Sequence, residues 1–302
     1  MQHSVLSDRP HVQTGFAGAP GPEGDALDGP HRLRAEILSH GSIPGAPAIL
    51  AEILALLDEE RDIQDVAEVI ELEPGLTAKL LRTANSPFFG QSRNVTSIQR
   101  AIVVLGTSLV RNVSIGFAVW DTISGGLPSE QVEALWSHAV TVAIAARHMA
   151  IAIRSCDPDE AFTAGLLHDC GQLVLARARG EVYRDVRERV ASGASAHLAE
   201  RAAIGVDHAA VGSWLLEAWN LPAPLVAAVR EHHSAEPGPG LPALIAVTSA
   251  LARIEEIEED RLDGREHATR AAAANCGISA DLWADAASAV LTEDTLRHLA
   301  RA

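Results

Sequence analysis

The sequence is poor in aromatic residues, and this shortage argues against a β-rich fold. Phe, Trp and Tyr make up 4% of the 302 residues, and runs of β-branched residues are few. Ala, Leu, Glu and Arg are abundant instead, and these residues favour helix. With 47% apolar residues, the chain has enough side chains to bury a substantial core. We therefore expect an all-α fold.

Positive charge is also scarce. Lys and Arg total 24 against 40 Asp and Glu, so the formal net charge is −16 at pH 7. A surface with this charge repels phosphate backbones, and no Lys/Arg cluster or aromatic-basic stripe offsets the repulsion. We therefore expect no binding to nucleic acid.

Cysteines are few, and long apolar runs are missing. Cys156, Cys170 and Cys276 have spacings that match neither a zinc ribbon nor a disulfide framework. The first residues, MQHSVLSDRPHVQTGFAG, lack the charged start and apolar core of a secretory signal, and no stretch reaches about 18 apolar residues. These features predict a cytoplasmic protein that does not associate with membranes.

The chain divides into a tail and two groups of helices. Residues 1–33 are rich in Gly, Pro and acids, which predicts a disordered tail. Apolar residues at helical spacing then follow one another over 40–125 and, after a Ser-Gly-Gly-Leu-Pro break, over 128–237. Residues 238–302 predict further helices that complete the second group. We expect two helical subdomains packed into one unit.

Some of the thirteen histidines fall on apolar helix faces, where they point inward. A single histidine in such a place is usually a hydrogen-bonded core residue, and this interpretation stays open for each one taken alone. As a set they predict a metal site, because imidazole and carboxylate bind borderline divalent metals and a carboxylate between two histidine sets can bridge a metal pair. The candidate ligands are His138, His168, Asp169, His208, His232 and His233.

The stretch AGLLHDCGQLVLA, residues 164–176, resembles the His-Asp motif of the HD superfamily of metal-dependent phosphohydrolases. The resemblance makes His138 the first histidine and His168-Asp169 the pair. It makes His208 and the doublet at 232–233 the extra ligands of the branch that hydrolyses cyclic dinucleotides. The implied cofactor is a divalent metal, either Fe, Mn or Zn.

Three groups that this chemistry needs are missing. The position of the superfamily's closing aspartate is best matched by Ser249, and a hydroxyl cannot replace an anionic ligand. An early glutamate of the cyclic-dinucleotide branch would fall at Ala134. A lysine that polarises the phosphate is replaced by Gln172, which removes a positive group from the charge that develops on a phosphoryl oxygen. We expect no efficient phosphodiester hydrolysis.

Residues 40–237 resemble the HDOD family, the HD-related output domain of bacteria, over nearly the whole domain. The segments SIPGAPAILAEIL, LEPGLTAKLLRTANSPFFG, VTSIQRAIVVLG, LWSHAVTVA, AFTAGLLHDCGQLVLA, GVDHAAVGSWLLEAWNLP and VREHH agree with it in type and order. The resemblance implies a helical domain that kept the HD scaffold, usually lost catalysis and contacts other signalling proteins.

The stretch ANSPFFG is a candidate partner surface, formed by Asn85, Ser86, Phe88 and Phe89. Pro87 restrains the residue before it to extended geometry, so the two phenyl rings project from a turn. Aromatic residues on a rigid turn are suited to anchoring a partner. The alternative is that both rings fold under and pack between adjacent helices, while Asn85 and Ser86 bind the neighbouring backbone.

Three hypotheses about function follow. The first is a non-catalytic signalling protein that acts through protein–protein contacts. The second is a metal-dependent phosphohydrolase acting on cyclic dinucleotides or nucleotide phosphodiesters. The third is a pocket that binds a metal or a nucleotide as a sensor without turnover. Metal analysis of untagged protein separates them best, because a histidine tag would itself bind metal.

Overall fold

The structure, a computed structural model, describes residues 29–39, 45–55, 63–86 and 94–255, with a few positions between 273 and 284. The described part is all helical, with no strand, so the predicted fold class is confirmed. Its helices are α1 (Gly29–Ser39), α2 (Ala48–Ala55), α3 (Ile63–Glu71), α4 (Pro74–Ala84), α5 (Ile98–Leu105), α6 (Thr107–Ser124), α7 (Ser129–Ile153), α8 (Pro158–Leu167), α9 (Cys170–Ala178), α10 (Gly180–Ala191), α11 (Ala196–Ile204), α12 (His208–Ala218), α13 (Ala223–Glu231) and α14 (Leu241–Glu255).

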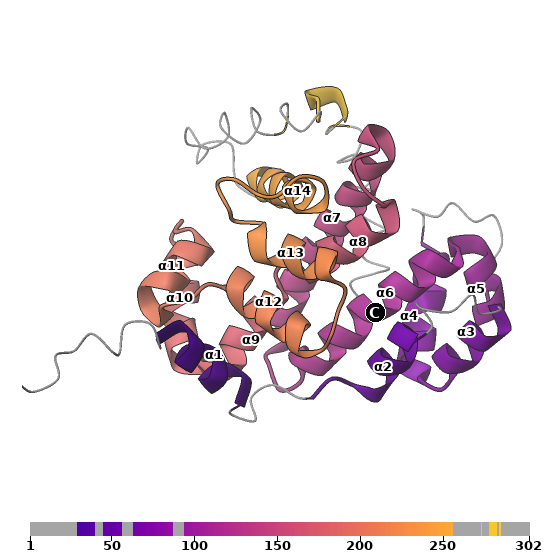
Figure 1. Ribbon diagram of the computed structural model, residues 1–302, viewed down its shortest axis with the longest axis horizontal. Helices are drawn as coiled ribbons and strands as arrows, with labels where there is room; N and C mark the ends of the chain where they lie inside the picture. The colour runs from indigo at the N-terminus through magenta and orange to yellow at the C-terminus, as the bar shows by residue number, and fades with distance from the viewer. Residues whose placement is uncertain are drawn as a thin grey trace, which may run out of the picture.

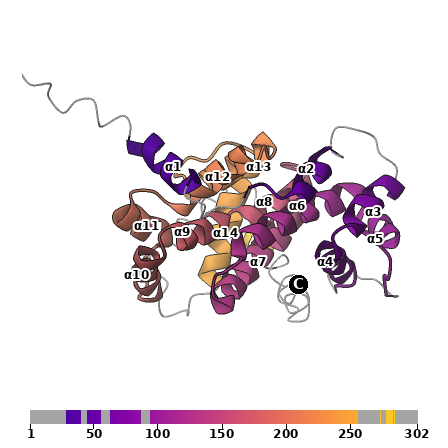
Figure 2. The ribbon, with the colours of Figure 1, turned by 90° about the horizontal axis from the view of Figure 1, so that it is seen from below.

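Helices α2 to α5 gather at one end of the molecule, and α7 to α14 form the larger bundle beside them (Figure 1). Helix α6 joins the two groups, since it packs against α2 and α4 on one side and against α8 and α9 on the other. Figure 2, turned by 90°, shows the same separation. The indole of Trp120 on α6 donates a hydrogen bond to the backbone oxygen of Leu166 on α8, 2.7 Å away, and this bond anchors the first group near the end of α8.

Two glycines allow helices of the bundle to approach closely. A Cβ at Gly165 would lie 2.5 Å from the Cα of Ala143, so α8 rests directly on the backbone of α7. A Cβ at Gly171 would lie 2.0 Å from the backbone oxygen of His208, so α9 meets the start of α12 in the same way. These contacts bring the turn between α8 and α9 next to α7 and α12.

Helix caps fix where the neighbouring helices begin. Asp157 accepts hydrogen bonds from the backbone nitrogens of Asp159 and Glu160, both at 2.9 Å, and starts α8. Asp207 accepts from the backbone nitrogen of Ala210 at 2.9 Å and starts α12. Helix α12 therefore begins at His208, the residue immediately after its cap.

Parts of the predicted domain division lie outside the described residues. Helix α1 begins at Gly29, within the segment predicted as a tail, and residues 1–28 are not described. Most of 256–302 is not described either, so the predicted helices there stay a prediction. Helix α14 packs against α7, α8 and α13. No single described helix combines the length and apolarity needed to cross a membrane, and α5 with α6 reaches them only as a pair bent by 112°.

Candidate metal centre

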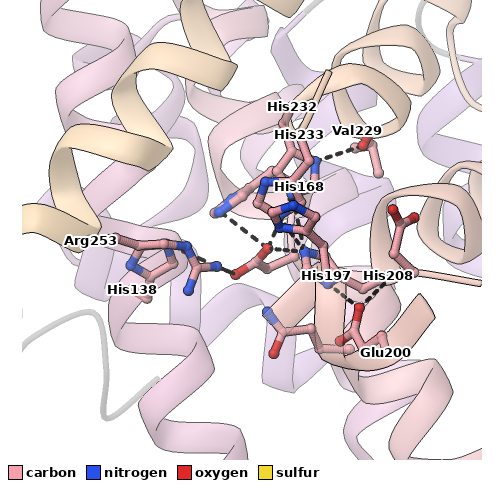
Figure 3. A network of polar contacts seen from close by, with 12 residues as sticks. His138, His168, His197, Glu200, His208, Val229, His232, His233 and Arg253 are labelled. Atoms are coloured by element: carbon pink, nitrogen blue, oxygen red, sulfur yellow. Dashed lines mark hydrogen bonds and ion pairs between the residues drawn. The ribbon is translucent and has the colours of Figure 1, made fainter. Parts of the chain in front are cut away.

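The six predicted ligands come together in the interior of the larger bundle (Figure 3). Helix α7 supplies the first histidine, the α8–α9 turn supplies the His-Asp pair, the start of α12 supplies another histidine and the end of α13 supplies the doublet. The residues are His138, His168, Asp169, His208, His232 and His233, and all but the last are buried.

Three ring nitrogens face one carboxylate oxygen, Asp169 Oδ1. The Nε2 atoms of His208, His232 and His168 lie 3.0, 3.4 and 3.5 Å from it. Because Asp169 is fully buried, no solvent screens its charge. This oxygen is therefore the centre of one half of the pocket.

The donor atoms on this side are spaced as ligands of one ion. His208 Nε2 lies 3.2 Å from His232 Nε2 and 2.9 Å from His233 Nε2. Metal–nitrogen bonds of about 2.1 Å place neighbouring ligands of a tetrahedral zinc ion about 3.4 Å apart, and octahedral ones somewhat closer. Asp169, His208, His232 and His233 could thus hold a divalent metal ion, with all four ligand atoms within 4.8 Å of one another.

Backbone hydrogen bonds set the tautomers of two rings. His168 Nδ1 lies 2.7 Å from the backbone oxygen of Gly165, and His232 Nδ1 lies 2.7 Å from that of Val229. A carbonyl only accepts, so both Nδ1 atoms donate and both Nε2 atoms carry lone pairs. Nε2 of His168 is buried and has no hydrogen-bond partner among the described residues. Lone pairs that meet a carboxylate in this way suit a cation between them.

Glu200 orients His208 from behind, and sequence reasoning missed it. Its Oε2 accepts from the Nδ1 of His208 at 2.6 Å and from the same residue's backbone nitrogen at 2.8 Å. A carboxylate behind a histidine fixes the ring and makes it a stronger metal ligand. The hydroxyl of Tyr183 lies 3.1 Å from Glu200 Oε1 and 3.2 Å from Gln172 Oε1, which extends the network to α9 and α10.

The same contacts decide which histidine carries a proton when no metal is present. Burial alone would lower the pKa of His208, but Asp169 on one ring nitrogen and Glu200 on the other raise it to about 9. Burial lowers the pKa of His168, His232 and His233, so these rings are neutral. Without metal, His208 is therefore the imidazolium of the cluster.

A guanidinium faces the other oxygen of Asp169, and this residue too was missed. Arg253 Nη2, from α14, lies 2.5 Å from Asp169 Oδ2. His138 Nε2 lies 3.9 Å from the same oxygen. Burial alone would raise the pKa of Asp169, but His168, Arg253 and His208 outweigh it, and the pKa is well below its usual value. Figure 3 shows Arg253 and His138 on one side of the cluster and His208 and Glu200 on the other.

Comparison with known proteins identifies the domain that carries this pocket. The family model described as the HDOD domain matches residues 43–235. This chain belongs to the HDOD family.

Solved structures share the HDOD fold. One, a protein from Shewanella amazonensis provisionally named a phosphohydrolase, is 27% identical with a TM-score of 0.69, and the match covers 88% of this chain and 97% of that one. An HDOD domain protein of unknown function from Geobacter sulfurreducens is 23% identical with a TM-score of 0.66, and the match covers 90% of this chain and 93% of that one.

A sequence relative, an uncharacterized protein from Treponema pallidum, is 26% identical over 200 residues, which are 64% of this chain but 38% of that relative.

The three positions where the sequence departs from the HD pattern carry no compensating charge. Ser249 is buried on α14, one turn before Arg253 on the same helix. Ala134 is exposed on α7. Gln172 is buried, with its Oε1 beside the Tyr183 hydroxyl. The acids and the lysine of the HD pattern are therefore not replaced at these positions, and the unforeseen charge, Arg253, is positive and comes from another position.

The structure describes two of the four residues of the candidate partner surface. Asn85 binds the backbone of Val95 through both ends of its amide, at 2.7 and 2.8 Å, so it stabilises the chain's own loop. Ser86 is 1% exposed and does not lie on a surface. These contacts agree with the alternative role foreseen for Asn85, while the partner surface itself stays a prediction. Phe88 and Phe89 lie outside the described residues.

Proposed function

We propose that this HDOD protein is a non-catalytic regulatory protein of bacterial signalling that acts by contacting other proteins. Its pocket binds a metal or a nucleotide and does not turn over a phosphate ester. The proposal takes the signalling role from the family and the loss of catalysis from the pocket of this chain.

The ion pair between Arg253 and Asp169 carries the proposal. Hydrolysis of a phosphodiester on two metal ions needs anionic ligands that balance the ions and leave a bridging carboxylate free on both sides. Here Asp169 is the carboxylate that faces the ring nitrogens, and one of its oxygens is bound by a guanidinium. Glu200 contacts Nδ1 of His208, whereas the other ring nitrogen, Nε2, faces Asp169. Negative charge for two ions is therefore lacking among the described residues of the pocket.

The phosphate itself would also lack a positive partner. Gln172 stands where a lysine would stabilise the charge on the phosphoryl oxygen, and its amide oxygen lies against Tyr183. Arg253 is neutralised by Asp169. A phosphate ester in this pocket would therefore meet little of the electrostatic stabilisation that its transition state requires.

A second candidate, a metal-dependent phosphohydrolase, is favoured by a specific observation. The donor set of Asp169, His208, His232 and His233 is spaced for a metal ion, and a structure provisionally named a phosphohydrolase is similar at 27% identity. If it binds there, a divalent ion would supply a bound water of lowered pKa.

A hydrolysis assay separates the two functions. Untagged wild-type protein and Asp169→Ala are incubated with Mn²⁺ or Fe²⁺ and either a cyclic dinucleotide or a nucleotide phosphodiester. We expect no turnover above the level of the variant, because the pocket lacks the charges for it. Turnover by the wild type that disappears in Asp169→Ala would establish the phosphohydrolase and reject the proposal.

A capture experiment tests the protein–protein role. Wild-type protein, Phe89→Ala and a matched control, Val103→Ala, are used as baits, because Val103 is an apolar residue of α5 that is 59% exposed. We expect a signalling protein to be retained by the wild type and by the control and lost with Phe89→Ala. Equal retention by all three baits would remove this stretch as the contact surface.

A further inference from the structure

The two oxygens of Asp169 face different groups. Oδ1 faces the Nε2 atoms of His208 and His232, at 3.0 and 3.4 Å. Oδ2 lies 2.5 Å from the guanidinium of Arg253. A carboxylate that bridges two metal ions would present one oxygen to each. On the Oδ2 side, a side chain of this protein already supplies the positive charge.

We propose that Arg253 takes the place of a second cation, so that the pocket binds one divalent metal ion, on the Oδ1 side of Asp169. The ligands are Asp169, His208, His232 and His233. This inference deepens the proposed function, on which it rests, because it names the ligand of the same pocket and the number of ions it takes.

The donor atoms of the proposed site lie close together. On the Oδ1 side, four distances between donor atoms of the proposed ligands run from 2.9 to 3.4 Å, as the edges of one coordination sphere do. His138, His168 and Asp169 also have ligand atoms within 4.8 Å of one another. His168 Nε2, however, lies 3.5 Å from Oδ1, and only His138, at 3.9 Å, is given a distance to Oδ2. The Oδ2 side is distinguished by Arg253, whose guanidinium binds this oxygen at 2.5 Å.

The charge balance of the pocket also favours one divalent metal ion. Asp169 and Glu200 supply two negative charges, and Arg253 supplies one positive charge. With neutral histidines, one divalent ion leaves the pocket a single positive charge in excess. A second divalent ion would leave three, in an interior where unpaired charge is costly. Ser249, at the position of the closing aspartate, offers nothing to offset them.

Arg253 reaches Asp169 from α14, a helix that carries none of the proposed metal ligands. Helix α14 packs against α7, α8 and α13, the helices that carry or adjoin four of the five histidines. The side chain of Arg253 is 33% exposed, whereas Asp169 is fully buried, so the guanidinium reaches inward to the carboxylate from the rim of the bundle. Replacing Arg253 would free the Oδ2 atom of Asp169 without substituting any ligand of the first ion.

The test is the metal content of untagged protein. Wild type, Arg253→Met, Arg253→Lys and a control, Arg147→Met, are dialysed against low micromolar Zn²⁺, and zinc and protein are then quantified. Arg147 is a fitting control because it too is a partly buried arginine paired with an aspartate, Asp159 at 3.2 Å, away from the pocket. We expect one ion per chain in the wild type, in Arg253→Lys and in the control, and two in Arg253→Met.

Thermal unfolding with and without Zn²⁺ shows that each variant is folded and gives a second measurement. The ion should raise the Tm of Arg253→Met more than that of the wild type, because two bound ions stabilise more than one. Two ions or none in the wild type would overturn the inference, and so would one ion in folded Arg253→Met. The wild-type ratio decides the question even if Arg253→Met does not fold. None of these results depends on hydrolysis or on a partner protein, so the proposed function fails or stands separately.

Discussion

The two sides of Asp169 are built in different ways. On the Oδ1 side, the backbone of Gly165 and Val229 fixes the rings of His168 and His232, at 2.7 Å in both cases. On the Oδ2 side, the guanidinium of Arg253 lies at the end of a long side chain from the bundle rim. The first arrangement is part of the fold, whereas the second can be removed by one substitution.

Under the proposed function, this difference would explain how a hydrolase scaffold loses catalysis and still keeps a binding site. The imidazoles on the Oδ1 side are also core residues, so changing them disturbs packing and hydrogen bonds. Charges at the edge of the pocket can change at little cost to folding. In this chain Arg253, whose side chain is 33% exposed, is such a charge, whereas Ser249, one turn before it on α14, is neutral and buried.

The largest expected effect is on the packing that supports the Oδ1 side. In Gly171→Ala the new Cβ would lie 2.0 Å from the backbone oxygen of His208 and 2.7 Å from the backbone nitrogen of Gly212, and backbone atoms cannot move aside cheaply. We expect the free energy of unfolding to fall by about 3 kcal/mol or more, measured by urea denaturation.

A matched glycine serves as the control for this substitution. At Gly180 a Cβ meets nothing within 4 Å, so Gly180→Ala should stay within about 1 kcal/mol of the wild type. Equal stabilities of the two variants would show that the α9–α12 contact is not as close as described.

The next prediction compares the loss of Zn²⁺ affinity when one histidine is removed from each side of Asp169. His233→Ala removes a ligand of the tight set and should weaken Zn²⁺ binding by more than about 100-fold, because a lost ligand costs more than a lost outer partner. His138→Ala removes a residue of the other side, 3.9 Å from Oδ2, and should leave affinity within about 3-fold. Calorimetric titration measures both, and a larger loss in His138→Ala would reverse the assignment of the two sides.

A smaller effect is expected from the group behind His208. Glu200→Gln keeps the shape of the side chain but removes the charge that holds the ring, so Zn²⁺ affinity should fall by about 10- to 100-fold with one ion still bound. Competition against a zinc-binding dye gives the affinity. An unchanged value would mean that Glu200 serves only the packing of α11 against α12.

The smallest effect belongs to Tyr183→Phe, which removes the hydroxyl 3.1 Å from Glu200 Oε1. The loss of one buried hydrogen bond should cost about 1 kcal/mol of unfolding free energy, measured by thermal denaturation. Zn²⁺ affinity should change less than in Glu200→Gln, because Oε2, which contacts His208, keeps its bonds. A greater loss of affinity in Tyr183→Phe would place the tyrosine, and not the glutamate, in control of the ring.

The sequence is sufficient to predict the helical fold and the residues that converge. Apolar residues at helical spacing place His138 and His208 on inward faces, and the His-Asp motif places His168 and Asp169 together. The structure brings these residues into one pocket. Their binding of a metal stays a prediction, as do the boundaries of the two subdomains.

Glu200 and Arg253 could not be found in the same way. Glu200 lies in the stretch SAHLAERAAIG, where a charged side chain is expected to face solvent, and the packing of α11 against α10 and α12 buries it fully. Arg253 reads as an ordinary basic residue near the end of a helix. The available signal was its position one turn after Ser249, on the helix that should have carried the closing aspartate.

The most direct test of the account is a crystal structure of untagged protein grown with Zn²⁺, with the ion located by anomalous scattering. We predict one peak per chain, about 2.0 to 2.2 Å from the ring nitrogens of His208, His232 and His233 and from Asp169 Oδ1, with Arg253 bound to Oδ2. A second peak about 3.5 to 4 Å away, with Arg253 displaced, or no peak at all, would contradict it.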